Sequence, residues 1–282
     1  MRPTSMSSIS HRASASLTRD WQNFDLALED GVATLTLSRP EKLNALTFET
    51  YADLRDLVAE LPHRDEAKVL VITGAGRGFC SGGDVEEIIG ELRKLAPAQL
   101  LEFTRMTGAV VKALRECPLP VIAAVNGIAA GAGSVIALAA DLRLLAQSAS
   151  FAFLFTRVGL AGADMGSAYL LPRVVGLGRA TELLMLGDKL SAERAHEIGL
   201  ASEVVPDGEL AARASALARR LAQGPALAYS TTKVLLTREL DMDLGSAIEL
   251  EAITQALLMK SEDHAEFYRA WSEGRAPVWQ GR

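Results

Sequence analysis

Two glycine-rich turns, each placed between an apolar strand-like run and a helix-like run, are the segments of this sequence best suited to chemistry. The first is Val69-Leu-Val-Ile-Thr-Gly-Ala-Gly-Arg-Gly-Phe-Cys-Ser-Gly-Gly-Asp84, and the second is Val121-Ile-Ala-Ala-Val-Asn-Gly-Ile-Ala-Ala-Gly-Ala-Gly-Ser134. A helix that begins at such a turn leaves backbone N–H groups unpaired, and its dipole adds positive potential there. Amides from both turns that converge on one point would form an oxyanion hole, where each donor stabilises developing negative charge by about 2.7–4 kcal/mol.

A single glycine-rich turn is more often a close-packing site or a phosphate cradle. Neither segment ends in the Lys-Ser/Thr pair of a P-loop, and Gly74-Ala-Gly-Arg-Gly78 lacks the spacing of a dinucleotide-binding fingerprint. The oxyanion interpretation therefore depends on the presence of both turns.

The residues around the turns have the periodicities of alternating strands and helices. Val32–Ser38 alternates apolar and polar residues like a half-buried strand, and Val69–Thr73 and Val121–Val125 are apolar runs typical of buried strands. Thr47 can cap a helix whose apolar stripe is Phe48, Tyr51, Leu54, Leu57 and Leu61, and Asp84 begins another helix. Further helices are predicted at 100–114, at 131–139 and from about 177 onward, with strands at 142–145 and 151–153. This alternation indicates an α/β core with a helical C-terminal region.

Composition restricts the class of protein. The 282 residues are 49% hydrophobic, which is enough to fill a large core, and the net charge is −6. Without a basic block, nucleic acid is not expected as the main partner, and no apolar run reaches the roughly 18 residues of a membrane span. Two cysteines, Cys80 and Cys117, favour a reducing compartment. We expect a core at 21–205 and a helical cap or oligomerisation region at 206–282.

Residues 1–20 have a different composition from the rest. They are rich in serine, contain Arg2, Arg12 and Arg19, and have no acidic residue before Asp20. That composition is typical of an organellar transit peptide, but a disordered tail or an early start codon, with Met6 as another candidate start, also accounts for it. We interpret the segment as a disordered tail of a cytoplasmic protein, with an organellar matrix as the alternative location.

Four stretches carry a family resemblance. They are Leu37-Ser-Arg-Pro-Glu-Lys-Leu-Asn-Ala-Leu46, Gly78-Phe-Cys-Ser-Gly-Gly-Asp84, Val125-Asn-Gly-Ile-Ala-Ala-Gly-Ala-Gly133, and Ala195-His-Glu-Ile-Gly-Leu200 with Val204-Val-Pro206. In them the chain resembles the crotonase superfamily, also called the enoyl-CoA hydratase/isomerase family, from about Phe24 to Trp279. The resemblance implies a spiral of ββα units, an acyl-CoA thioester substrate and a homotrimer or dimer of trimers. It implies no cofactor other than the CoA of the substrate.

The resemblance also assigns roles to individual residues. It gives the two oxyanion amides to Gly83 and Ala132. It places Ser81, Asp84 and Val85 around the thioester end of the substrate.

Four other residues are expected along the CoA moiety. Leu43 and Ala45 would follow its adenine and pantetheine. Lys42 could meet a CoA phosphate, although a solvated surface lysine is an equally good interpretation. Arg275, in the family's closing segment Trp271–Trp279, is a further candidate phosphate partner.

The chain departs from the family at the two positions where hydratases carry catalytic glutamates. Aligning the second glycine-rich turn places Val135 at the first position, and aligning Val158-Gly-Leu160 places Phe155 at the second. The phenylalanines Phe151, Phe153 and Phe155 would alternate on a strand. Hydration needs a group that activates water and another that donates a proton, and neither Val135 nor Phe155 can do this. Standard hydration is therefore not expected.

Asp164 is the leading candidate for the acid/base. It lies in the glycine-containing loop Gly159–Ser167, where dienoyl-CoA isomerases and dihydroxynaphthoyl-CoA synthases of the family also place an aspartate, at offsets that differ by one or two residues. A carboxylate there with a raised pKa could move protons on the acyl chain. Capping of the following helix is the alternative role for Asp164. Tyr169 is a weaker candidate that could orient an acyl carbonyl.

These observations favour an enzyme that stabilises a thioester enolate and performs isomerisation or related bond making and breaking. A thioester or ring-opening hydrolase on the same fold is the first alternative. The second is a homologue that binds CoA without catalysis, and an RNA-binding member of the family is disfavoured by the acidic charge.

Overall fold

Ten strands form two sheets in the part of the chain that the computed structural model describes, which comprises residues 16–18, 20–64 and 66–282. The larger sheet has the order β1-β2-β3-β5-β7-β10, and its neighbours are parallel except for the antiparallel pair β1 and β2. Its strands are β1 (Phe24–Glu29), β2 (Val32–Leu37), β3 (Val69–Gly74), β5 (Val121–Val125), β7 (Leu142–Ala146) and β10 (Glu203–Val205). The smaller sheet is β4 (Gly78–Cys80), β6 (Ile128–Ala130), β8 (Ser150–Ala152) and β9 (Leu190–Ser191), in that order.

The chain passes three times from the larger sheet to the smaller one and then into a helix. The strand pairs are β3 with β4, β5 with β6, and β7 with β8, and the helices that follow include α3 (Pro97–Glu116), α4 (Ala132–Ala139) and α5 (Ser167–Val175). The predicted α/β spiral of ββα units is therefore confirmed. The remaining helices are α1 (Phe48–Glu60), α2 (Gly90–Leu92), α6 (Leu177–Leu186), α7 (Ala192–Glu197), α8 (Leu210–Ala222), α9 (Ala226–Arg238), α10 (Leu244–Leu258) and α11 (Glu262–Glu273).

Local signals in the sequence placed several of these elements correctly. The Thr47 hydroxyl caps α1 by accepting a hydrogen bond from the Thr50 amide at 3.2 Å. Asp84 also caps a helix, although its first turn, Val85–Ile89, is π-helical and α2 after it has only three residues. All eight residues of α4 are buried, because alanine, glycine and serine let this helix pack closely on every side.

Three sequence-based expectations need correction. The strand β8 ends at Ala152, and Phe155 lies instead on a 3₁₀ turn, so the three phenylalanines do not alternate along one strand. The short strands β4 and β6 inside the glycine-rich turns were not predicted, nor was β10 within the helical C-terminal third. Strands of three residues are too short to give a periodic signal.

The domain boundaries also differ in detail from the expected ones. Leu17, in the segment interpreted as a tail, is buried in the core, while residues 1–15 lie outside the described residues. Helix α8, beyond the expected boundary at 205, packs on β3, β5 and β7 with buried residues that include Leu210 and Ala214. The core therefore includes α8.

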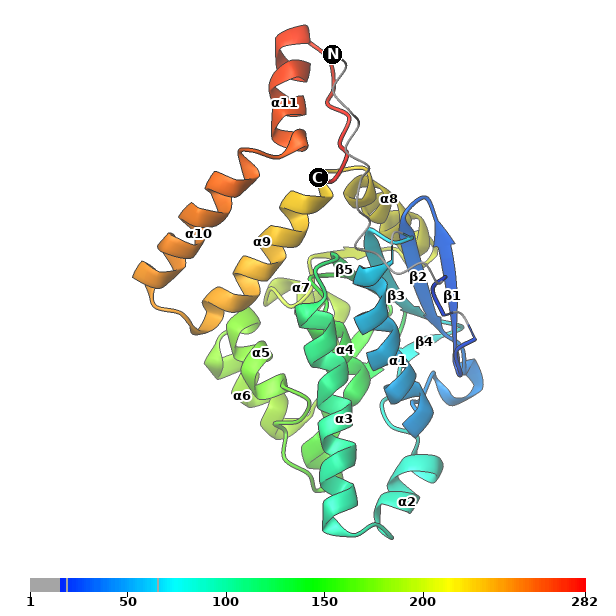
Figure 1. Cartoon of the computed structure of the whole chain (residues 1–282). Coiled ribbons are helices and arrows are strands. Elements are labelled where there is room, and N and C mark those ends of the chain that lie inside the picture. Colours follow the sequence, from blue (N-terminus) through cyan, green and yellow to red (C-terminus); the bar gives the residue numbers. More distant parts are fainter. Residues whose placement is uncertain (1–15, 19, 65) are drawn as a thin grey trace.

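The last three helices extend away from the sheets (Figure 1). Helix α9 packs on α3, α10 packs on α9, and α10 has no buried residue. The C-terminal segment lies against α11, where Asp263 accepts hydrogen bonds from the amides of Gln280 and Gly281. Within the described residues, none of the helices is both long and apolar enough to span a membrane.

Candidate active site

The two glycine-rich turns lie side by side because the strands that lead into them are neighbours. β4 and β6 pair in parallel, with Gly78 opposite Ile128 and Cys80 opposite Ala129. Their carboxyl ends therefore lie at one edge of the small sheet, which is where ligands bind in many α/β folds. The turn after β4 contains Gly83, and α4 begins with Ala132 directly after the turn that follows β6.

Glycine is required where these turns touch. Gly82 has a φ of +99°, and a Cβ there would lie 3.0 Å from the carbonyl oxygen of Ala130 and 3.5 Å from the amide nitrogen of Ala132. A Cβ on Gly133 would overlap the carbonyl oxygen of Cys80. The two turns thus pack backbone against backbone, an approach that only residues without a side chain permit.

The amides of Gly83 and Ala132 remain free in this arrangement. Leu46 holds the first turn in place, since its amide donates to the Gly82 oxygen at 2.8 Å and its oxygen accepts from the Asp84 amide at 2.9 Å. Those two bonds flank Gly83 without using its N–H group. Ala132 is the first residue of α4, so its N–H has no partner in the helix. No described residue accepts a hydrogen bond from either amide.

Asp164 lies half-buried in the loop before α5. Its Oδ1 accepts a hydrogen bond from the Met165 amide at 2.8 Å, and its own amide donates to Ser167 Oγ at 3.1 Å. Burial raises the pKa of Asp164 above its ordinary value, and the Met165 amide only partly opposes this. The residue before α5 is Gly166, and no side chain caps this helix, so the capping role proposed as the alternative for Asp164 is wrong.

Tyr51 lies beside the first turn, although the sequence pattern indicates only that it belongs to the apolar stripe of α1. Its side chain is 3% exposed, and its hydroxyl lies 3.6 Å from the point that a Cβ on Gly83 would occupy. Burial raises the pKa of Tyr51, and the nearby Cys80 and Asp164 raise it further. In the sequence, only the hydroxyl group that Tyr51 adds to the apolar stripe of α1 indicates a possible polar contact.

The two positions where the family's hydratases carry glutamates are apolar and enclosed here. Val135 is fully buried in α4, and Phe155 is 8% exposed on the 3₁₀ turn Leu154–Val158. Neither side chain has a proton to transfer.

The segment expected along CoA forms an ordered surface beside the first turn. Asn44 fixes it, because its side-chain amide donates to the oxygens of Ala75 at 2.9 Å and Gly78 at 2.8 Å. The Ser81 amide donates to the Leu43 oxygen at 2.9 Å. Leu43 is partly exposed with a φ of +51°, and Ala45 is buried. The segment therefore keeps its shape through contacts between backbone and side chains.

Charged residues on this surface are already paired with one another. Lys42 pairs with Glu86 at 2.8 Å, and this hydrogen bond raises the pKa of Lys42. Asp84 pairs with Arg39 at 3.2 Å and accepts from the amides of Glu86 and Glu87. Burial acts to raise the pKa of Asp84, but these amides and the two cations hold it below its ordinary value.

Two other predicted binding residues differ sharply in their surroundings. Val85 is 72% exposed, as a residue that contacts a ligand at the surface would be. Arg275 pairs with Glu266 at 2.5 Å and with Glu273 at 2.6 Å beside α11, and α11 lies at the opposite end of the chain's fold from α2 (Figure 1). The structure does not bring Arg275 together with Lys42 within one chain.

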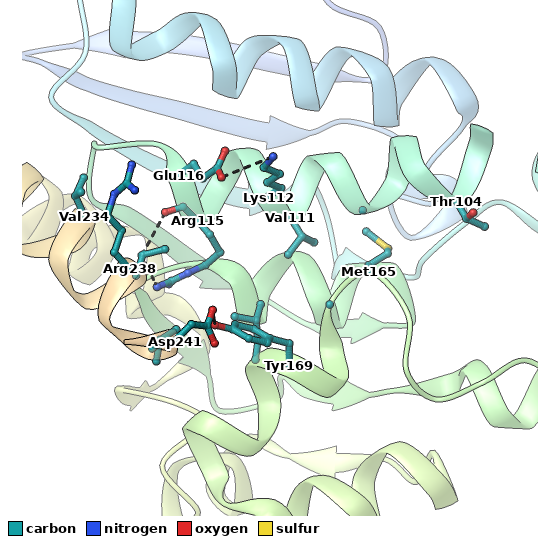
Figure 2. Close-up of a pocket in the computed structure, with 15 residues that line it drawn as sticks. Thr104, Val111, Lys112, Arg115, Glu116, Met165, Tyr169, Val234, Arg238 and Asp241 are labelled. Atoms are coloured by element: carbon teal, nitrogen blue, oxygen red, sulfur yellow. Dashed lines mark hydrogen bonds and ion pairs between the residues drawn. The ribbon is translucent and has the colours of Figure 1, made fainter. Parts of the chain in front are cut away.

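A cavity of about 810 Å³ lies between α3, α5 and α9 (Figure 2). Met165 and Val111 form an apolar part of its wall, next to the loop that carries Asp164. Arg115, Tyr169 and Asp241 form a polar part. The Tyr169 hydroxyl donates to Asp241 at 2.7 Å, so the phenol already has a partner in this wall.

Comparisons with known proteins agree on one family. A family model described as Enoyl-CoA hydratase/isomerase matches residues 27–282. A crystal structure described as "putative enoyl-CoA hydratase from Streptomyces coelicolor A3(2)" superposes on this chain with a TM-score of 0.94. The two sequences are 62% identical, and the match covers 98% of this chain and 100% of that one. The 1,2-epoxyphenylacetyl-CoA isomerase of Escherichia coli (strain K12) is 40% identical over 90% of this chain and 97% of its own. A Rhodobacter capsulatus protein named "Probable enoyl-CoA hydratase" is 41% identical over 90% and 96%.

Proposed function

Because this chain belongs to the enoyl-CoA hydratase/isomerase family and is an acyl-CoA-processing enzyme of that family, we propose that it isomerises an unsaturated acyl-CoA or performs a related enolate reaction. In the proposed reaction, Gly83 and Ala132 donate hydrogen bonds to the thioester oxygen and Asp164 moves the proton. The reaction needs no cofactor beyond the CoA of its substrate. The free state of both amides, on turns that pack against each other, is the observation that supports this most directly.

The proposed chemistry follows from where negative charge develops. Removal of a proton next to the thioester carbon leaves an electron pair that moves onto the carbonyl oxygen. Two fixed N–H donors stabilise this charge more than they stabilise the neutral carbonyl, because they need no reorganisation when the charge forms. The helix dipole of α4 acts in the same direction.

Asp164 would supply the proton transfer. As a carboxylate it takes a proton from one carbon of the acyl chain, the double bond shifts, and the carboxylic acid, whose proton exchanges with solvent, delivers a proton to another carbon. One C–H bond breaks and one forms, so nothing else is consumed. A raised pKa makes the carboxylate a stronger base and suits it to both halves of this transfer.

We expect the purified protein to catalyse proton exchange and double-bond migration, with little hydration. Incubation with 3-butenoyl-CoA in deuterated buffer should give crotonyl-CoA that carries deuterium, detected by NMR and mass spectrometry. Crotonyl-CoA alone should give at most trace 3-hydroxybutyryl-CoA, because Val135 and Phe155 cannot activate water. Hydration of crotonyl-CoA at the rate of a two-glutamate hydratase would contradict the proposal.

The same assays separate the rival functions. A hydrolase would release free CoA, which a thiol reagent detects, whereas an isomerase would not. A homologue that only binds CoA would give calorimetric binding without deuterium exchange on any acyl-CoA. The double variant Val135→Glu/Phe155→Glu restores both glutamates. It should hydrate crotonyl-CoA faster than the wild type if the lack of these glutamates is the reason for the low hydration rate.

We further propose that α10 forms part of a trimer interface. Its exposed apolar residues include Leu244, Ile248, Ile253 and Leu257, the first and last of which are 76% and 72% exposed. Helix geometry places Leu244 and Ile248 on one side of α10 and Ile253 and Leu257 on the opposite side, so the helix exposes apolar side chains on more than one side. Exposed apolar side chains of this kind mark an interaction surface, and copies of the same chain can bury them in a closed symmetric assembly.

The double variant Ile253→Glu/Leu257→Glu should therefore dissociate the assembly. In analytical ultracentrifugation, the wild type should sediment at about three times the chain mass of 30.1 kDa or at a multiple of that, and the variant at the chain mass. The exposed Glu249→Gln on the same helix serves as a control that should leave the mass unchanged. A wild type that sediments as a monomer at micromolar concentration would rule out this role for α10.

A further inference from the structure

The Tyr51 hydroxyl is a buried hydrogen-bond donor without a partner. The residue is 3% exposed, and no described residue forms a hydrogen bond with its hydroxyl. The hydroxyl oxygen is nevertheless not completely sealed from solvent. It therefore keeps some contact with solvent-accessible space.

The Tyr51 hydroxyl lies beside the first oxyanion turn. The Tyr51 oxygen lies 3.6 Å from the Cβ position of Gly83, and a Cβ is about 2.5 Å from the amide nitrogen of its own residue. The hydroxyl is thus within about 6 Å of the Gly83 nitrogen. A thioester oxygen bound to that amide would sit about 2.9 Å from the nitrogen, so Tyr51 is the phenol next to the thioester end of the proposed site.

Packing keeps the phenol where it is. The Phe103 ring of α3 meets the Tyr51 ring edge-to-face at 5.9 Å and 87°, and Phe48 packs on Phe103 at 5.1 Å. The residues of α1 on either side, Thr50 and Leu54, are also buried. Tyr51 cannot turn its hydroxyl toward bulk water without breaking these contacts.

The hydroxyl also remains a donor. Two titratable groups lie close enough to affect it, the Cys80 thiol and the Asp164 carboxylate, and both raise the pKa of Tyr51 on top of the effect of burial. Burial raises the pKa of Cys80 to about 12, so the thiol is neutral and competes poorly as an acceptor. Asp164 accepts from Met165 and is not hydrogen-bonded to Tyr51.

We propose that Tyr51 donates a hydrogen bond to an oxygen atom carried by the acyl chain near the thioester, and so selects oxygen-bearing acyl groups over hydrocarbon ones. This rests on the proposed function, because it requires a thioester held by Gly83 and Ala132. Those two amides already occupy the two lone pairs of the thioester oxygen, which leaves Tyr51 for an acceptor further along the chain. A hydrocarbon chain in the same place leaves the donor desolvated and unpaired, which weakens its binding.

A matched pair of ligands tests this selection. We expect isothermal calorimetry to show that the wild type binds 3-hydroxybutyryl-CoA about five- to tenfold more tightly than butyryl-CoA, the range of one neutral hydrogen bond. In Tyr51→Phe, which keeps the ring and its packing, the ratio should fall to about one. Tyr229→Phe, a partly buried tyrosine in α9, is the control and should keep the wild-type ratio.

The outcomes separate the two proposals. If neither acyl-CoA binds, the proposed function fails and the selection with it. If both bind equally well to the wild type, or if Tyr51→Phe weakens both ligands by the same factor, the selection is wrong while the proposed function stands. Thermal unfolding of Tyr51→Phe within a few degrees of the wild type would show that any change in ratio does not come from misfolding.

Discussion

Replacing Ala132 with proline should lower the rate of deuterium exchange into the substrate by about 10²–10³-fold, the effect of removing one oxyanion donor. Proline lacks only the N–H group at issue, and the first position of a helix tolerates it, because that N–H has no partner in the helix and the helical φ suits the ring. Ala132 occupies this position in α4. The ring would also place a carbon where the amide hydrogen points. Rapid-quench kinetics with NMR detection measures the rate of exchange.

Two controls test whether slower exchange comes from the lost amide and not from a changed side chain or from misfolding. Ala132→Gly keeps the amide and the space around it, so its exchange rate should stay within a few-fold of the wild type. Circular dichroism and thermal unfolding should show that Ala132→Pro is folded. A folded proline variant with wild-type exchange would mean that the Ala132 amide does not contact the thioester oxygen.

Replacing Asp164 with asparagine should lower exchange and isomerisation by about 10²–10⁴-fold, the usual contribution of a general acid/base. Asparagine keeps the shape of the side chain and an oxygen that accepts from the Met165 amide, so the loop should hold its conformation. Acyl-CoA binding measured by calorimetry should change little. Ser167→Ala is the matched control, because it removes the oxygen that accepts a hydrogen bond from the Asp164 amide but leaves the carboxylate in place.

The pKa of Asp164 gives this prediction a second readout. In the folded state the pKa is raised, so the protonated form is favoured and the ionised form costs stability. This cost is absent below the ordinary pKa and appears as the pH rises through the raised one. At pH 7, Asp164→Asn should therefore unfold at the same temperature as the wild type or a higher one, while its activity is lost. The acid limb of the wild-type rate profile should lie at a higher pH than the ordinary pKa of an aspartate side chain.

An Asp164→Asn variant that remains active but unfolds at a lower temperature would contradict both readouts. That result would mean that the Asp164 carboxylate stabilises the loop, and that another group transfers the proton. Tyr51 and Tyr169 both have raised pKa values, so neither could act as a base near neutral pH.

The sequence by itself determined the parts of this protein that depend on neighbours in the chain. Thr47 and Asp84 begin helices as predicted, since a capping side chain reaches only the next two or three amides. The glycine-rich turns follow buried strands, and the family motifs identify an acyl-CoA enzyme. The apolar character of Val135 and Phe155 is also a property of the sequence alone.

Only the tertiary structure decided how distant residues meet. The pairing of β4 with β6 brings the two turns together, and strands of three residues leave no periodic trace in the sequence. The capping alternative for Asp164 could be rejected only when its hydrogen bonds were visible, because an aspartate before a helix looks the same in either role. Tyr51 lies beside Gly83 although 32 positions separate them, since burial and contact depend on packing in three dimensions, and local periodicity records only which face of a helix is apolar.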